Sequence, residues 1–111
     1  MGSQVNDVNA RMSELARRFV ARTGTEVVQM RAALALLDAG DRSGLAQIHQ
    51  LAHRACGTGG TLGLLVLSDA AGELERRIEA CAKEGIPDAA ERAQIAAGIE
   101  AVAAELALLQ E

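Results

Sequence analysis

The sequence predicts an all-α protein, an antiparallel up-and-down bundle of four helices, and three observations support this fold class. Apolar residues make up 50% of the 111 residues, but Phe19 is the only Phe, Tyr or Trp, which is typical of an aliphatic helix core rather than a sheet. Apolar residues recur at steps of three and four along four stretches. Turn signals at Gly40, Gly63 and Gly85 separate these stretches, so residues 1–111 are interpreted as one bundle domain.

The first two predicted helices meet at a glycine turn. The first covers residues 12–37 and ends at Gly40, and a short lead-in helix before residue 12 is left open as an addition. Asp41 is a natural N-cap for the second helix, and Gly63 is expected to end it. The buried stripe of the first helix is predicted to contain Met12, Ala16, Phe19, Thr23, Val27, Met30, Leu34 and Leu37. The stripe of the second is predicted to contain Leu45, Ile48, Ala52, Ala55 and Gly59.

The third helix is expected to follow Gly63 and to stop near Gly85, with Pro87 in the turn. Asp88 and Glu91 have the spacing of a capping box, which predicts the start of the fourth helix. The two predicted buried stripes are Leu67, Ala71, Leu74, Ile78 and Cys81, and then Ile95, Ile99, Val102, Leu106 and Leu109. The polar residues of the third helix expected to point mainly to water are Glu73, Glu75, Arg76, Arg77 and Glu79.

Composition argues against several classes of function. The net charge is -4 and aromatic rings are nearly absent, so the chain lacks both the positive charge and the stacking surfaces of nucleic-acid binding proteins. No apolar run reaches the roughly 18 residues needed to span a bilayer. The N-terminus also lacks a signal sequence, so we expect a cytoplasmic protein that uses no membrane. Cys56 and Cys81 are expected to be free thiols.

His53 stands out on the second helix. At about 100° per residue, it projects roughly 140° away from the mean direction of the apolar side chains, which predicts exposure. An exposed histidine is usually an ordinary surface residue, but Gly57 and Gly60 follow it on the same face and leave the neighbouring surface bare. Gly59 faces the core and is expected to allow close helix packing. A bare surface beside an imidazole suits phosphoryl transfer, which needs phosphorus about 3 Å from a ring nitrogen.

The run from His53 to Gly63 resembles the histidine-containing phosphotransfer family, the HPt domains of bacterial phosphorelays. That family carries His, two residues, Lys, Gly, Ser, and then Gly at the tenth place after the His. Gly57 and Gly63 match in place, and Thr58 replaces Ser conservatively. Three residues of the following helix fit the usual continuation: Ala70, Leu74 and Glu75.

This resemblance implies that His53 is phosphorylated, that Gly57 admits the active site of the partner, and that Gly63 ends the histidine helix. Cys56 stands where the family usually has the lysine that offsets phosphoryl charge. Arg54 is a candidate substitute, although an exposed Arg is at least as often a solvated surface charge. Cys56 itself is expected to be a small, half-buried residue rather than a redox sensor. The residues proposed to shape the site and dock the partner are Gly57, Gly60, Arg54, Cys56, Thr58, His49 and Gln50.

His49 lies one turn before His53, a spacing at which two histidines can bind a metal. The sequence lacks the Glu that follows the first His in the zinc-protease motif, and it shows no obvious third ligand. We therefore predict no metal site. Packing at the edge of the core or hydrogen bonding near the site is the expected role of His49.

The predicted function is that of a histidine phosphocarrier. Neutral His53 would accept a phosphoryl group from a receiver-domain aspartate and pass it to another receiver. The chain has no glycine-rich nucleotide loop, so we expect no autokinase activity and no cofactor, with Mg²⁺ on the partner. The expected partners are response-regulator receiver domains and a hybrid histidine kinase, and the chain is expected to be a monomer or weak dimer. Two alternatives stay open: a bundle that binds a receiver or kinase without transfer, and a dimerisation module.

Overall fold

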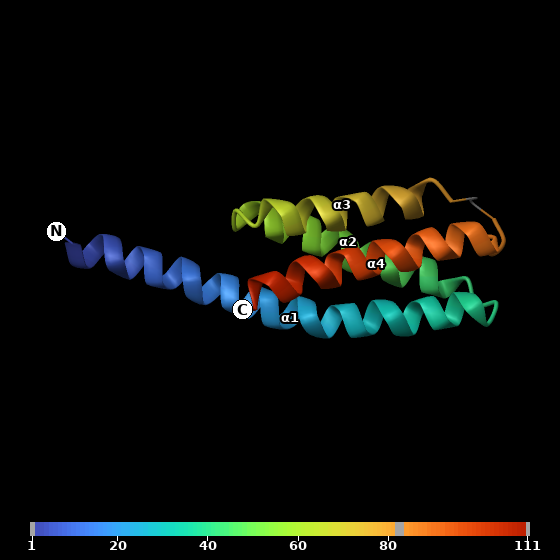
Figure 1. Cartoon of the computed structure of the whole chain (residues 1–111), viewed down its shortest axis with the longest axis horizontal. Coiled ribbons are helices and arrows are strands. Elements are labelled where there is room, and N and C mark those ends of the chain that lie inside the picture. The colour runs from blue at the N-terminus through green and yellow to red at the C-terminus, as the bar shows by residue number, and fades with distance from the viewer. Residues whose placement is uncertain (1, 82–83, 111) are drawn as a thin grey trace.

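The computed structural model describes residues 2–81 and 84–110, with side chains described from residue 13 onward. Four helices follow one another along the chain: α1 (Gly2–Asp38), α2 (Ser43–Thr61), α3 (Leu65–Glu79) and α4 (Ala89–Leu109). α1 packs against α2 and α4, and α3 packs against the same two helices, so the four helices form a closed bundle (Figure 1). The described residues contain no strand, and the predicted all-α four-helix bundle is confirmed.

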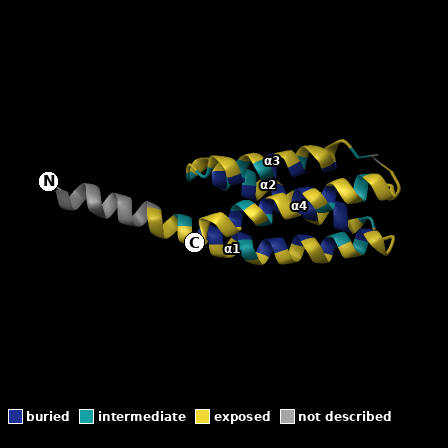
Figure 2. Cartoon of the chain, in the orientation of Figure 1, coloured by how far each residue is buried: buried dark blue, intermediate teal, exposed yellow. Residues whose placement is uncertain are grey.

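The core of the bundle is aliphatic and lies between the inward faces of the four helices (Figure 2). The predicted stripes supply most of it, including Met30, Ile48, Leu74 and Ile99, whose side chains are fully buried. Leu109 was wrongly placed in this core: it is 43% exposed, because it is the last residue of α4 and borders an open hollow with Ala16 and Val20 of α1. The side chain of Met12 falls outside the described part of the chain. Within the described residues, no helix is long and apolar enough to cross a membrane.

Glycines end the first two helices, as predicted. Gly40 has a φ of 90° and Gly63 a φ of 78°, in the left-handed region that favours glycine. After Gly63, the N–H of Leu64 donates to the carbonyl oxygen of Gly59 at 2.8 Å, which is the closing hydrogen bond of a Schellman motif. The N–H of Asp41 closes the same motif at the end of α1. The chain therefore reverses sharply at both ends of α2, which fixes this helix between α1 and α3.

The other helix boundaries were predicted with mixed success. Asp88 and Glu91 form the predicted capping box at the start of α4. α2 begins one residue later than expected, with Arg42 as its N-cap, although the Asp41 carboxylate still accepts a hydrogen bond from the N–H of Ser43 at 2.9 Å. The lead-in helix is not a separate element, because α1 is one helix from Gly2.

α3 ends at Glu79, well before Gly85, so the predicted end of this helix was wrong. Its last fully packed residue is Ile78, and Cys81 is only half-buried, so the apolar stripe stops one turn earlier than the sequence pattern indicates. Gly85 belongs to the loop before α4. There its carbonyl oxygen accepts a hydrogen bond from the Arg42 guanidinium, which ties this loop to the turn between α1 and α2.

Candidate functional site

His53 lies on the outer side of α2, at the edge that faces α3. Its side chain is 71% exposed, which confirms the exposure predicted from helical phase. Its chain neighbours Ala52 and Ala55 are buried in the core, so the backbone that carries the imidazole is firmly packed. The imidazole is therefore presented to solvent by a packed helix rather than by a loop.

Glu75 on α3 is the main partner of His53 within the protein. Its carboxylate is hydrogen-bonded to Nδ1 of His53, and its side chain is only 16% exposed. The expectation that Glu75 points to water was wrong, because the antiparallel register of α2 and α3 places it opposite the histidine. The pairing of His49 with Glu79 follows the same register. Periodicity shows which face of a helix is buried, but it does not show which polar residue of the next helix lies opposite.

The contact with Glu75 determines which nitrogen of His53 is free. An ionised carboxylate only accepts hydrogen bonds, so in the neutral ring the proton lies on Nδ1. Nε2 then carries the lone pair of the ring. A carboxylate behind an imidazole also stabilises positive charge that develops on the ring. Glu75 is thus a positioning residue for His53. The only sequence feature that singled it out was its fit to the family pattern.

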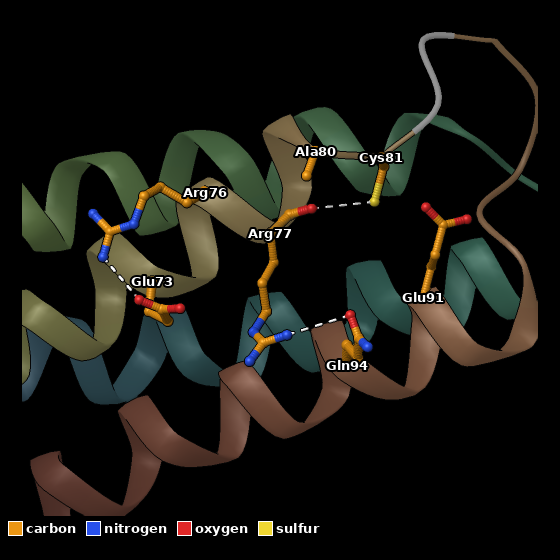
Figure 3. Close-up of a pocket in the computed structure, with 7 residues that line it drawn as sticks. All are labelled: Glu73, Arg76, Arg77, Ala80, Cys81, Glu91 and Gln94. Carbon is orange, nitrogen blue, oxygen red and sulfur yellow. Dashed lines mark hydrogen bonds and ion pairs between the residues drawn. The ribbon is translucent and has the colours of Figure 1, made fainter.

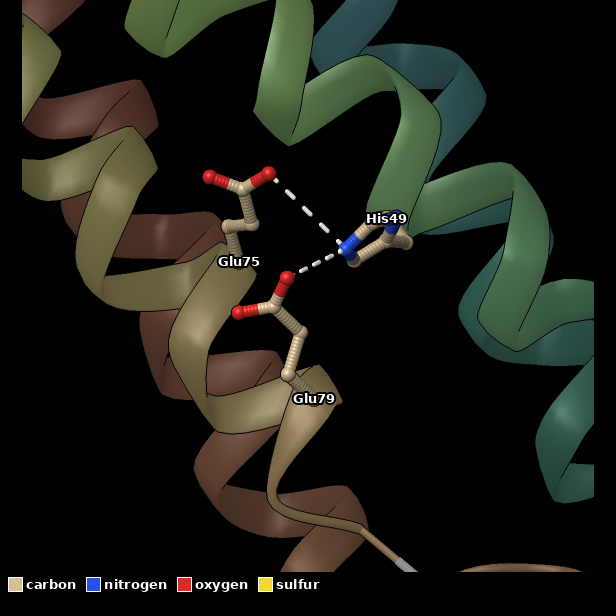
Figure 4. A group of neighbouring side chains, drawn as sticks. All are labelled: His49, Glu75 and Glu79. Carbon is tan, nitrogen blue, oxygen red and sulfur yellow. Dashed lines mark hydrogen bonds and ion pairs between the residues drawn. The ribbon is translucent and has the colours of Figure 1, made fainter. Parts of the chain in front are cut away.

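His49, Glu75 and Glu79 form a second cluster between α2 and α3 (Figure 4). Nε2 of His49 lies 3.1 Å from a Glu79 carboxylate oxygen and 3.8 Å from one of Glu75. The His49 and His53 rings stack with centroids 6.4 Å apart. The ligand atoms of the cluster lie within 4.8 Å of one another, so these residues could hold a metal ion, with Glu75 and Glu79 as the ligands that the sequence did not reveal. Ion pairs between His49 and the two carboxylates also account for the geometry without any metal.

The glycines beside His53 divide into two kinds. Gly59 is buried, and a Cβ there would lie 3.4 Å from Cβ of Ser68 on α3, so it serves helix packing as predicted. A Cβ on Gly57 would meet nothing within 4 Å, and one on Gly60 would meet only the Ser68 hydroxyl oxygen, at 3.4 Å. Packing within the chain therefore does not require Gly57 to be glycine. Gly57 and Gly60 thus form an exposed strip without side chains next to His53.

The arrangement of the helices around this histidine agrees with the comparison with known families. A family model described as Hpt domain matches residues 14–109. The chain belongs to the Hpt domain family. Hpt domains act in histidine phosphotransfer in phosphorelays, as carriers and not as kinases, and they interact with receiver domains and histidine kinases. No curated protein and no solved structure gives a significant match to the chain.

In this Hpt domain, Cys56 is half-buried between α2 and α3. The Ser68 hydroxyl donates to the Cys56 carbonyl oxygen at 2.8 Å, and the Cys56 sulfur lies close to Gly72. This is the small, semi-buried position expected from the sequence. Burial raises the pKa of the second thiol, that of Cys81, which keeps it in the unreactive protonated form. Neither cysteine is in a disulfide.

Arg54 turns away from Glu75 and toward α1. Its Nη2 lies 3.5 Å from a carboxylate oxygen of Glu26, and Nε of Arg22 lies 3.6 Å from the same oxygen. The Glu26 side chain is only 8% exposed, so it needs these two cations. The structure therefore joins Arg54 to Glu26 and not to the surroundings of His53.

The remaining candidates of the Hpt domain lie around the edge of this surface. Thr58 is half-buried and lines a surface hollow with Phe19 and Leu62, on the side of α2 that faces α1. Gln50 is exposed, one turn before His53. The structure thus brings His53, His49, Gly57 and Gly60 to the side of α2 that faces α3, and it places Thr58 and Arg54 on the side that faces α1.

Proposed function

We propose that this Hpt domain carries a phosphoryl group on Nε2 of His53, taking it from the phosphorylated aspartate of one receiver domain and passing it to the aspartate of another. One observation carries the proposal: an exposed imidazole with Nδ1 held by Glu75, beside a strip left bare by Gly57 and Gly60. Such a site offers a nucleophile in a fixed tautomer and leaves room for a bulky partner.

The proposed step is a reversible displacement at phosphorus. The lone pair of Nε2 forms an N–P bond, the P–O bond of the aspartyl phosphate breaks, and its electron pair returns to the receiver carboxylate. The Nδ1 proton stays in its hydrogen bond to Glu75, whose negative charge offsets the positive charge gained by the ring. Metal and acidic pocket would come from the receiver, because phosphoryl transfer depends mainly on positioning and charge stabilisation.

The test is transfer from a receiver domain loaded with radiolabelled acetyl phosphate and Mg²⁺. We expect label on the chain that is lost in acid and retained in base, as for phosphohistidine, and that depends on the receiver being present. Omitting the receiver controls for direct reaction with acetyl phosphate. Absence of label on the chain, with receiver binding still measurable by calorimetry, would favour the alternative of a non-transferring binding module, which the cysteine in place of lysine at position 56 keeps open.

Glu75 provides a second prediction for the same assay. Glu75→Ala removes the acceptor behind Nδ1, so the ring loses its preferred tautomer and orientation, and we expect the transfer rate to fall about tenfold. Glu79→Ala is the matched control, since it removes a carboxylate from the same face of α3 that contacts His49 instead. We expect the control to stay within about twofold of the wild type. Equal rates in the two variants would show that Glu75 does not position the nucleophile.

A further inference from the structure

A phosphoryl group on His53 would bring negative charge close to two carboxylates between α2 and α3. It carries about two negative charges at neutral pH. Nδ1 of the ring is bonded to the Glu75 carboxylate, and Glu79 lies next to Glu75 on the same face of α3. Three anionic groups would then share one small surface. A cation that reaches the phosphoryl oxygens would lower the free energy of the phosphorylated form.

Arg54 is poorly suited to this task. It would have to leave Glu26, whose carboxylate is almost fully buried and would keep only Arg22 as a cationic partner among the described residues. Removing a cationic partner from a buried carboxylate costs more free energy than an exposed contact to a phosphoryl group returns. The cation has to come from a residue whose present partner is easily given up.

Arg76 meets this condition on α3. Its Nη2 bonds a Glu73 carboxylate oxygen at 2.9 Å, one turn away on the same helix. Both side chains of this pair are mostly exposed, at 66% and 60%. An exposed ion pair of this kind contributes little to stability, so Arg76 can exchange Glu73 for a more highly charged anion at little cost.

Arg76 borders a hollow on the α4 side of α3, but its guanidinium also approaches α2. It follows Glu75 in the chain, and its Nη1 lies 3.5 Å from the point where a side chain on Gly72 would begin. The Cys56 sulfur lies 3.1 Å from that same point. The guanidinium therefore rests at the seam between α2 and α3, beside the residue one turn after His53. Any larger residue at position 72 would fill this space.

The neighbouring Arg77 does not share this placement. Figure 3 shows the two arginine side chains leaving α3 in different directions, with Arg77 reaching Gln94 on α4 at 3.3 Å. Arg76 instead stays over its own helix, next to Glu73. Both arginines border one surface hollow between α3 and α4, but their guanidinium groups point in different directions, which makes Arg77 a matched control.

We propose that Arg76 moves from Glu73 to the phosphoryl group on His53 and stabilises the phosphohistidine, supplying from α3 the positive charge that Cys56 does not supply from α2. This inference rests on the proposed phosphocarrier function. It requires only a change of rotamer in an exposed side chain, with α2 and α3 unmoved.

The test compares Arg76→Gln, Arg77→Gln and the wild type in the receiver transfer assay. We expect Arg76→Gln to reduce the fraction of labelled chain at equilibrium about fivefold, with no such change in Arg77→Gln. The difference should shrink as salt concentration rises, because the contact is exposed. Arg76→Lys should recover part of the loss, since it keeps the charge without the forked geometry. A merely structural role would not depend on salt in this way.

A relocation experiment sharpens the test. Adding Cys56→Lys to the Arg76→Gln variant places a cation on α2 beside the same seam, and we expect it to restore the labelled fraction. Equal labelling of Arg76→Gln and the wild type would overturn the inference, as would a fivefold loss in Arg54→Gln with none in Arg76→Gln. If the wild type is labelled normally, both of these results contradict only the role of Arg76 and remain compatible with the carrier function. An unlabelled wild type would instead overturn the carrier function itself.

Discussion

A His53→Gln variant is expected to take up less than about one thousandth of the phosphoryl label that the wild type takes from a receiver. Glutamine matches the histidine in polarity, but its amide nitrogen has no available lone pair, so it cannot attack phosphorus. The His53 side chain is mostly exposed, so the replacement should leave the fold unchanged. Quantified label on purified chain, together with a circular-dichroism spectrum matching the wild type, gives the measurement.

His49→Gln is the matched control for this variant. It removes the other imidazole of the same helix, one turn away, together with its contacts to Glu79 and Glu75 and its stacking with the His53 ring. We expect it to be labelled at least half as well as the wild type, because Nδ1 of His53 keeps its own bond to Glu75. If label persists in His53→Gln and disappears in His49→Gln, the assignment of the phosphorylated residue is wrong.

Gly44→Ala is expected to lower the free energy of unfolding by about 3 kcal/mol, and the melting temperature by about 10 °C. Gly44 is buried at the start of α2, where that helix crosses the end of α1. A Cβ at this position would overlap the backbone carbonyl oxygen of Ala33 and lie 3.1 Å from Cγ of Leu37. Backbone cannot move aside as a flexible side chain can, so α1 and α2 have to separate.

Gly57→Ala is the control for that experiment. It makes the same chemical change in the same helix, but the new methyl group meets nothing within 4 Å. Alanine is the better helix former, so we expect Gly57→Ala to raise the free energy of unfolding by up to about 1 kcal/mol. Urea denaturation followed by circular dichroism measures both variants. A Gly44→Ala protein as stable as the wild type would show that the two helices are not in tight contact at this point.

The fold was largely predictable because its main determinants are local. Apolar residues at steps of three and four mark the buried faces, and glycines at positions 40 and 63 mark the turns. The boundary errors arose where local pattern and tertiary packing disagree. Cys81 continues the apolar spacing of α3, but the helix has already ended at Glu79. Leu109 has the correct phase, but it is the last residue of α4 and borders an open hollow, so its side chain stays exposed.

The site was predictable only in part, for a different reason. Helical phase within α2 sufficed to place His53 at the surface and to separate Gly59 from Gly57. The contact between Glu75 and His53 depends on how α2 and α3 align, and that alignment is set by core packing spread over both helices. The direction of Arg54 likewise depends on Glu26, which is distant in the sequence and buried against α2 from α1.

Gly44 and Gly57 belong to the same helix, but only Gly44 is restricted by contacts within this chain. Gly44 is constrained by the backbone of this chain, so almost any substitution there would be selected against in every cell, whatever the signalling partners. Gly57 is unconstrained from within. Under the proposed function, its tolerance depends on the shape of the receivers that dock beside His53, and a duplicated copy of this domain could acquire a new set of receivers through changes at Gly57 without passing through an unstable intermediate.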